Sequence, residues 1–427
     1  MDIVKLIQHL PKPLIYATDN MLRSVGTALA PKMREVKLDH SSYVGVATDG
    51  SNVICERRGS TIILFSAISI TFMYDGGRYR VVNYSEADPS EFLFIAIPKF
   101  ASVSRANTLM RSLEYEVTLS EIGKNKEKDL VMMDGSYAST LLDSGRILNQ
   151  VYKDLSDLYH GRRNELAGIL RDVEKVMDTI IAKLENEKPL ERARKFFENY
   201  YIYVDTLSAN VMDKVLPAAR ISLLNFIIMS LEQSYALLCL GELIEACRKR
   251  DILLAWISKD SESRILSKNF GSFSLLNDIT IMDIVLDKDK YIILNEIVNI
   301  PPITKKWLMT KIANRDIYFV PRRLADTIYD NYGEYLTAYP KYLDYSIQIT
   351  APKLMVDQNK MDKIVSMLKH LSPLGYPEPL LLVHNRTKIA KKLVENISEG
   401  LYQRIKGKIS PLIRNMIGDI GRQRIGI

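Results

Sequence analysis

The first third of the chain carries short apolar runs, separated by turn-forming residues, which predict a set of β-strands. The runs 43–48 and 53–56 flank Asp49-Gly50-Ser51, so we expect one strand to end at Asp49 and another to follow at once. A second Asp-Gly-Ser triplet, beginning at Asp134, closes the apolar run 130–133. Further strands are predicted at 61–73 and 79–84, joined by the hairpin signal Asp75-Gly76-Gly77, and at 92–97, 252–258, 317–320 and 345–349.

Apolar residues recur every three or four positions in several longer segments, which predicts helices. One such segment covers about 102–122, and another covers 166–184 with the spacing of a coiled-coil seam or a helical hairpin. Pro189 and Pro217 predict the helix boundaries that follow. Shorter helices are predicted at 1–10, at 361–371, and from His384 to about residue 405.

The segment 221–240 is the nearest approach to a membrane span. Asn225, Glu232 and Gln233 interrupt it, and polar groups are costly at the centre of a span, so we interpret it as a buried helix. The first ten residues lack the apolar stretch and cleavage site of a signal peptide. The three cysteines form no CxxC motif, which is typical of a reducing compartment. We therefore expect a cytoplasmic protein that does not enter a membrane.

Composition and charge add only weak constraints. The 427 residues are 47% hydrophobic and 26% charged, which is ordinary for a globular protein. The net charge of +7 favours polyanionic partners through counterion release, but it specifies no chemistry. The order of elements predicts an α/β fold with a long, coiled-coil-like helical insertion. We divide the chain into an N-terminal helical segment (1–40), a first core part (41–144), the insertion (145–250) and a second core part with C-terminal helices (251–427).

The two Asp-Gly-Ser triplets are the strongest candidates for chemistry. An aspartate at the end of a strand presents its carboxylate at the sheet edge, and the glycine permits a tight turn. Two close carboxylates repel each other unless a cation lies between them. Mg²⁺ and Mn²⁺ take oxygen ligands, and a pair of such ions can activate the displacement at a phosphodiester. On the predicted helix 102–122, Glu114 and Glu116 flank the apolar stripe on either side, and periodicity does not choose between them. Each is a candidate third carboxylate, and each fits a solvated acidic face equally well.

His384 differs in setting from the other four histidines. It ends an apolar run and precedes Asn385-Arg386-Thr387-Lys388, so it is a candidate metal ligand, proton-transfer group or phosphate contact. On the residues alone a structural histidine is the simpler interpretation. Lys259, Arg264, Arg386 and Lys388 are candidate contacts to DNA phosphates, although each also fits an ordinary solvated surface charge.

The order of four motifs resembles the NurA nucleases of archaea. These motifs are Asp49-Gly50-Ser51, the helix with Glu114 and Glu116 followed by Asp134-Gly135-Ser136, the run from Ile252 to Ser261, and the segment from Gly375 to Leu380 with Val383-His384. The resemblance implies an RNase H-like mixed sheet flanked by helices, with a helical insertion, in a homodimer. It also implies that Asp49, Asp134, His384 and either Glu114 or Glu116 bind Mn²⁺ or Mg²⁺, with two ions expected.

The resemblance further implies a function and partners. NurA-like proteins act as 5′–3′ exonucleases and single-strand endonucleases on single-stranded DNA and double-stranded ends. They resect DNA ends for double-strand break repair together with a hexameric HerA-type translocase. In such a protein the metal site would activate water for attack on a backbone phosphorus.

Two other functions are compatible with parts of the sequence. A non-catalytic DNA-repair scaffold would use the helical insertion to organise partners and would tolerate loss of the site carboxylates. An ATPase related to actin and the sugar kinases would use Asp-Gly turns to meet nucleotide phosphates. The ATPase would also need a glycine-rich adenosine segment late in the chain, and the sequence has neither that segment nor a GxxxxGK[ST] loop.

Overall fold

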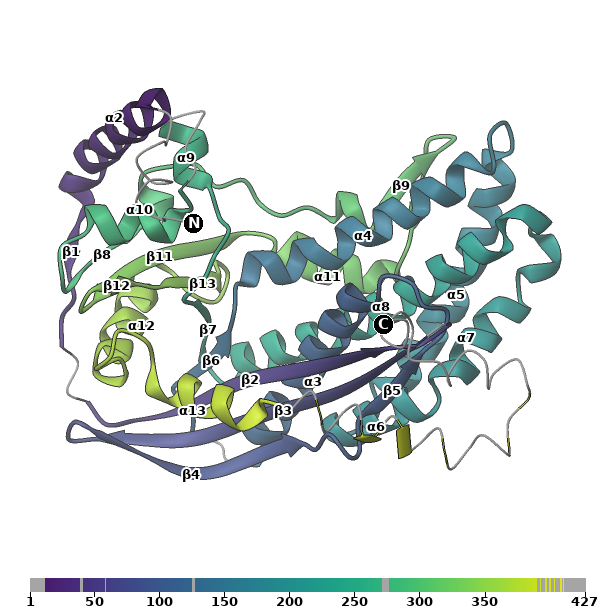
Figure 1. The fold of residues 1–427 in the computed structure, drawn as a ribbon, viewed down its shortest axis with the longest axis horizontal. Coiled ribbons are helices and arrows are strands. Elements are labelled where there is room, and N and C mark those ends of the chain that lie inside the picture. The colour runs from purple at the N-terminus through teal and green to yellow at the C-terminus, as the bar shows by residue number, and fades with distance from the viewer. Residues whose placement is uncertain are drawn as a thin grey trace, which may run out of the picture.

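The computed structural model describes residues 12–38, 41–57, 59–124, 127–270 and 276–389, and scattered positions between 392 and 410. The described strands are β1 (Arg34–Glu35), β2 (Tyr43–Glu56), β3 (Thr61–Asp75), β4 (Arg78–Ala87), β5 (Leu93–Ala96), β6 (Leu130–Asp134), β7 (Leu253–Ser258), β8 (Lys290–Ile293), β9 (Met309–Ile312), β10 (Arg315–Tyr318), β11 (Tyr335–Tyr342), β12 (Tyr345–Ser346) and β13 (Gln348–Pro352). Nine of them form a mixed sheet in the order β1-β8-β11-β13-β7-β6-β2-β3-β4, with β12 beside β11 and β5 beside β3 (Figure 1). The predicted α/β architecture, a large mixed sheet flanked by helices, is confirmed.

The centre of the sheet is parallel, because β6 runs parallel to both β2 and β7. β2 pairs with β3 without interruption from Tyr43 to Glu56. The predicted turn at Asp49-Gly50-Ser51 is therefore wrong, since this triplet lies inside one long strand. β2 stays extended through this triplet because β3 pairs with every one of its residues. On the other side of β2, the pairing with β6 ends at Thr48. The second triplet does end a strand, and Gly135 has a φ of +103°, which suits glycine.

Two helices pack on opposite faces of β2, namely α3 (Ser102–Lys124) and α13 (Glu378–Thr387). The Thr48 hydroxyl lies 2.8 Å from the Thr118 hydroxyl on α3. The next residue of the strand, Asp49, contacts His384 on α13. Successive side chains of a strand point to opposite faces of the sheet, so the two helices enclose β2 between them.

The chain between β6 and β7 is helical, as predicted, and the seam of the helix at 166–184 is buried. Pro189 begins a helix, and Pro217 begins a 3-10 turn before another. The segment 217–249 is long and apolar enough to cross a membrane, but 83% of its apolar window is buried within the protein, so it is a core helix.

The division of the chain into domains stays a prediction. The helices here are α4 (Tyr137–Asp157), α5 (Arg163–Leu184), α6 (Pro189–Glu198), α7 (Tyr200–Ala209) and α8 (Arg220–Lys249).

A smaller hydrophobic cluster lies apart from the main core, where α2 packs near β8 and β11 (Figure 1). Met21 and Val25 of α2 meet Leu266, Ile281 and Met282 there. The prediction of a helix at 1–10 lies outside the described residues. The remaining helices are α2 (Lys12–Leu29), α9 (Ile265–Phe270), α10 (Asp278–Val285), α11 (Arg322–Tyr332) and α12 (Gln358–Leu371), with 3-10 turns at Ala30–Lys32, Met212–Lys214, Pro217–Ala219, Leu294–Glu296 and Lys305–Trp307.

Several strand predictions need correction in detail. The segment predicted as one strand at 345–349 is two strands, β12 and β13, which pair with different residues of β11. The predicted strand at 317–320 begins earlier and ends at Tyr318. β8 and β11 were not predicted at all. The helix that carries His384 ends at Thr387, and most of the predicted continuation to residue 405 lies outside the described residues.

Candidate metal centre

Asp49 and His384 meet across 335 positions of sequence. The Nδ1 atom of His384 lies 2.8 Å from Oδ2 of Asp49. Asp49 is buried at the middle of β2, whereas the side chain of His384 is 39% exposed on α13. The pair therefore joins a buried carboxylate to an imidazole that solvent can reach.

Asp134 completes a group of three potential ligands. β6 pairs in parallel with β2 up to Thr48 and Met133, so the next residue of each strand is an aspartate, Asp49 on one and Asp134 on the other. One ligand atom each from Asp49, Asp134 and His384 lie within 4.8 Å of one another. This is the only such group among the residues that the structure describes. The parallel register of two neighbouring strands thus places the two aspartates together.

Glu114 approaches this group from the other face of β2, and Gly50 makes room for it. A Cβ atom built on Gly50 would lie 2.6 Å from Oε1 of Glu114 and 2.9 Å from its Cγ. Glu114 is buried on α3 and does not belong to the group of three. Burial, followed by the charges of Asp49 and Asp134, raises the pKa of Glu114 well above its usual value, while Arg111 opposes the shift. Glu114 is thus the helix carboxylate whose pKa the charges of the two aspartates raise.

Glu116 is turned away from the group of three. Its two carboxylate oxygens accept hydrogen bonds from Arg192 at 2.7 and 2.9 Å. The Tyr235 hydroxyl donates to it at 2.8 Å, and the Cys239 thiol lies at 3.2 Å. Both Glu116 and Arg192 are fully buried. The sequence left the choice between the two glutamates open, and the structure places only Glu114 beside the aspartates.

Tyr376 is a site residue that the sequence analysis did not single out, although it lies in the Gly375-Tyr376-Pro377 turn. Its hydroxyl donates to Oδ1 of Asp134 at 2.6 Å and lies 3.3 Å from the carbonyl oxygen of Ile257. Burial and the neighbouring Asp134 raise its pKa well above the usual value. The phenol therefore keeps its proton and holds the Asp134 carboxylate in one orientation.

The electrostatics of the group favour a bound cation. Burial raises the pKa of Asp49 from 3.8 to about 6, and the charge of Asp134 adds to this effect. The hydrogen bond from His384 and the backbone N–H of Gly50 act in the opposite direction but do not cancel it. Two carboxylates and one imidazole, all able to direct ligand atoms at one point, are a donor set that suits Mn²⁺ and accommodates Mg²⁺ less well, because imidazole is a softer ligand than oxygen. The residues therefore fit a divalent metal ion.

The four predicted DNA-contacting cations are all exposed. The Nζ atom of Lys259 lies 5.7 Å from the centre of the Tyr376 ring, which brings it near Asp134. Arg386 and Lys388 follow His384 at the end of α13, and Lys388 donates to Asn385. Arg264 precedes α9 and has no described contact to the group of three.

Comparison with known proteins identifies the family and the fold of the chain. The NurA domain family matches residues 44–389. A structure of NurA bound to dAMP and manganese matches with a TM-score of 0.65 at 14% identity, over 98% of this chain and all of that one. The NurA nuclease from Sulfolobus solfataricus matches with a TM-score of 0.53 at 16% identity, over 96% and 99% of the two chains. A structure of NurA with manganese gives a TM-score of 0.56 at 16% identity, over 95% and 99%.

No curated protein matches the chain. The chain has a large mixed α/β sheet flanked by helices, the fold of the solved NurA structures, and its paired aspartates form a candidate metal site. Because the family match covers most of its length, the chain belongs to the NurA family.

Proposed function

We propose that this protein is a divalent-metal-dependent DNA nuclease. The observation that carries the proposal is the convergence of Asp49, Asp134 and His384 within 4.8 Å, in a chain of the NurA family. Solved NurA structures contain manganese, and one also contains dAMP, a fragment of DNA. A carboxylate-rich cation site that accepts a nucleotide is the arrangement expected for phosphodiester hydrolysis.

The residues of the site have separable roles in this proposal. Asp49, Asp134 and His384 would hold Mn²⁺, or Mg²⁺, with Glu114 completing the shell of a second ion. The bound metal would supply Lewis-acid stabilisation of the developing negative charge and a water of lowered pKa. Tyr376 orients the Asp134 carboxylate. Because Nδ1 of His384 is engaged by Asp49, only its Nε2 is free to meet a metal ion or to transfer a proton.

The wider reaction is proposed on the resemblance alone. We infer an RNase H-like core, 5′–3′ exonuclease and single-strand endonuclease activities, and a role in DNA end resection in the cytoplasm. A homodimer and a HerA-type hexameric ATPase are the proposed partners. Lys259, Arg264, Arg386 and Lys388 are proposed to contact DNA phosphates, and the first of them is best placed because it lies beside Tyr376.

The test is cleavage of end-labelled single- and double-stranded DNA with Mn²⁺, Mg²⁺ or a chelator. We expect wild-type protein to degrade DNA only with a divalent ion, and Asp49→Asn and Asp134→Ala to lose at least about 100-fold in rate. Circular dichroism and thermal unfolding of the variants check that the fold is kept. Metal-independent cleavage, or full activity in both variants, would instead support the scaffold function.

A further inference from the structure

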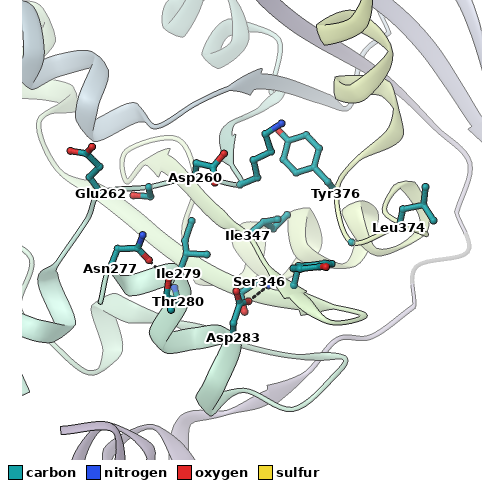
Figure 2. A pocket seen from close by; sticks show the side chains of 14 residues that line it. Asp260, Glu262, Asn277, Ile279, Thr280, Asp283, Ser346, Ile347, Leu374 and Tyr376 are labelled. Carbon is teal, nitrogen blue, oxygen red and sulfur yellow. Dashed lines mark hydrogen bonds between the residues drawn. The ribbon is translucent and has the colours of Figure 1, made fainter. Parts of the chain in front are cut away.

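A cavity of about 610 Å³ opens next to the metal centre. Figure 2 shows its side chains, which come from the segment after β7, from α10, from β12 and from the turn before α13. Its volume lies within the range of pockets that bind small organic ligands. Lys259, Asp260 and Ser261 line one edge of this cavity, and none of them belongs to the group of three potential metal ligands.

Tyr376 is shared between the cavity and the metal centre. Its ring lines the cavity, and its hydroxyl donates to Asp134. A ligand that touches this ring is therefore one side chain away from the candidate metal ligands. The cavity is placed to receive a part of the substrate that adjoins the reacting phosphate.

The charges around the cavity do not suit a phosphate. Three carboxylates line it, those of Asp260, Glu262 and Asp283, against the single ammonium group of Lys259. These carboxylates also do not converge on a cation, because the structure's described residues form only the one metal-type group at Asp49. Because carboxylates accept hydrogen bonds, the cavity suits a group that carries hydrogen-bond donors rather than an anion.

The cavity also offers apolar side chains and one buried hydroxyl without a hydrogen bond among the described residues. Tyr345 and Leu374 line it and are 65% and 70% exposed, so their surfaces are open to a ligand. Ile279 and Ile347 add apolar wall. The Oγ atom of Ser346, a residue only 3% exposed, has no hydrogen-bond partner among the residues that the structure describes. A buried polar atom without a partner is rare, and a bound ligand would supply one.

We propose that this cavity binds the base of the nucleotide next to the phosphate that is cleaved. The base would stack on Tyr345 and hydrogen-bond to the Ser346 hydroxyl. The carboxylates would accept hydrogen bonds from exocyclic amino groups, so adenine, cytosine and guanine should bind better than thymine, which has none. This inference rests on the proposed nuclease function, and it adds a nucleobase subsite to the metal centre.

The first experiment compares DNA substrates that differ by one base. A short single strand carries either adenine, thymine or a stable abasic residue at each successive position, and cleavage is followed with Mn²⁺. We expect the abasic residue to slow cleavage at one adjoining phosphate by about tenfold, the size expected for losing one stacked base. Thymine should give an intermediate rate. Equal rates for all three at every position would overturn the inference.

The second experiment uses variants that separate base binding from folding. Ser346→Ala removes a hydroxyl that has no partner, so the stability should not fall, while cleavage of the intact strand should slow about fivefold. Tyr345→Ala should slow it about tenfold. Neither variant should slow cleavage next to the abasic residue any further. Ser230→Ala, which removes an equally buried and unpartnered hydroxyl in α8, is the matched control and should leave both rates unchanged.

A binding measurement gives a readout that does not depend on turnover. With Mn²⁺ present, calorimetry compares the four deoxynucleoside monophosphates with 2-deoxyribose 5-phosphate. We expect the nucleotides to bind at least about tenfold more tightly than the sugar phosphate, with thymidylate the weakest, and the difference to shrink in Tyr345→Ala. Equal affinities for nucleotides and sugar phosphate would overturn the base subsite. Absence of any metal-dependent DNA cleavage would instead overturn the proposed nuclease function, so the two failures are distinguishable.

Discussion

Glu114 and Glu116 are two residues apart on α3, yet they have entirely different partners. Glu114 packs against Gly50 and faces the charges of Asp49 and Asp134. Glu116 forms a bidentate ion pair with Arg192 of α6. Two positions along a helix rotate a side chain by about 200°, so one glutamate reaches the sheet while the other reaches the helical layer.

Exchanging each glutamate for glutamine should separate these roles. Glu114→Gln replaces a buried carboxyl group that is costly to ionise with a neutral amide of similar shape, so the unfolding free energy should hold or rise while Mn²⁺ affinity and cleavage fall by about tenfold or more. Glu116→Gln leaves the Arg192 charge with a weaker partner, so stability should fall by about 2–4 kcal/mol. Urea unfolding and metal titration on both variants measure the contrast. A loss of stability in the first variant and not in the second would contradict the assignment.

Gly50→Ala should damage the site without a change of charge. The added Cβ would lie 2.6 Å from Oε1 of Glu114 and 3.1 Å from Cγ of Met110, so the glutamate must shift away from the sheet. We expect Mn²⁺-dependent cleavage to fall by roughly tenfold or more, because catalytic groups tolerate little displacement. Gly123→Ala on the same helix as Glu114 is the control, since a Cβ there meets nothing within 4 Å. Similar activity in the two variants would show that the approach of Glu114 is unimportant.

Tyr376→Phe should leave the Asp134 carboxylate less firmly oriented and keep the fold intact. The substitution removes one hydroxyl and its 2.6 Å hydrogen bond to the carboxylate, but keeps the ring. Loss of such a supporting contact commonly costs 10–100-fold in metal affinity or activity. We expect the metal concentration for half-maximal cleavage to rise by about tenfold, while saturating Mn²⁺ restores part of the rate. An unchanged metal dependence would remove Tyr376 from the site.

The metal-free protein should lose stability as pH rises through the titration of Asp49. Its pKa is raised from 3.8 to about 6 on folding, so the folded state holds a proton that the unfolded state has already released. The stabilisation is complete below about pH 4 and is lost as pH passes 6, with a total on the order of 3 kcal/mol. Urea unfolding in a chelator, wild type against Asp49→Asn, isolates this effect. Parallel pH profiles for the two proteins would contradict it, and added Mn²⁺ should remove the loss above pH 6.

Local sequence patterns predict most helices and strands of the first third of the chain. They fail where pairing with a neighbouring strand determines the secondary structure. Asp49-Gly50-Ser51 has the composition of a turn, but the long partner strand β3 keeps it extended. β11 was missed because Pro340 and its tyrosines resemble no alternating strand, yet it is buried between β8 and β13. The hydrogen bonds that keep these segments extended come from neighbouring strands, which the composition of the segment itself does not reveal.

The candidate ligands were predictable, but their geometry was not. Asp49 and Asp134 were marked by their neighbours in sequence, whereas His384 was favoured as a metal ligand only through the resemblance to the NurA nucleases, and the structure brings all three together. The choice of Glu114 over Glu116 depends on Arg192, whose position the helix periodicity of α3 does not reveal. Tyr376 lies in a motif that the resemblance names, but it was given no role, since only the fold shows that its hydroxyl meets Asp134.

The hydrogen bond between Asp49 and His384 joins two segments that a ribosome makes far apart in time. Asp49 and its strand leave the ribosome with the first tenth or so of the chain, and the histidine follows 335 residues later. At the usual rate of synthesis of about 5–20 residues per second, this interval is tens of seconds. During that time the emerging chain lacks one of its three ligands. With the proposed nuclease function, the metal site would stay incomplete until α13 is made, so the protein would gain its activity only late in its own synthesis.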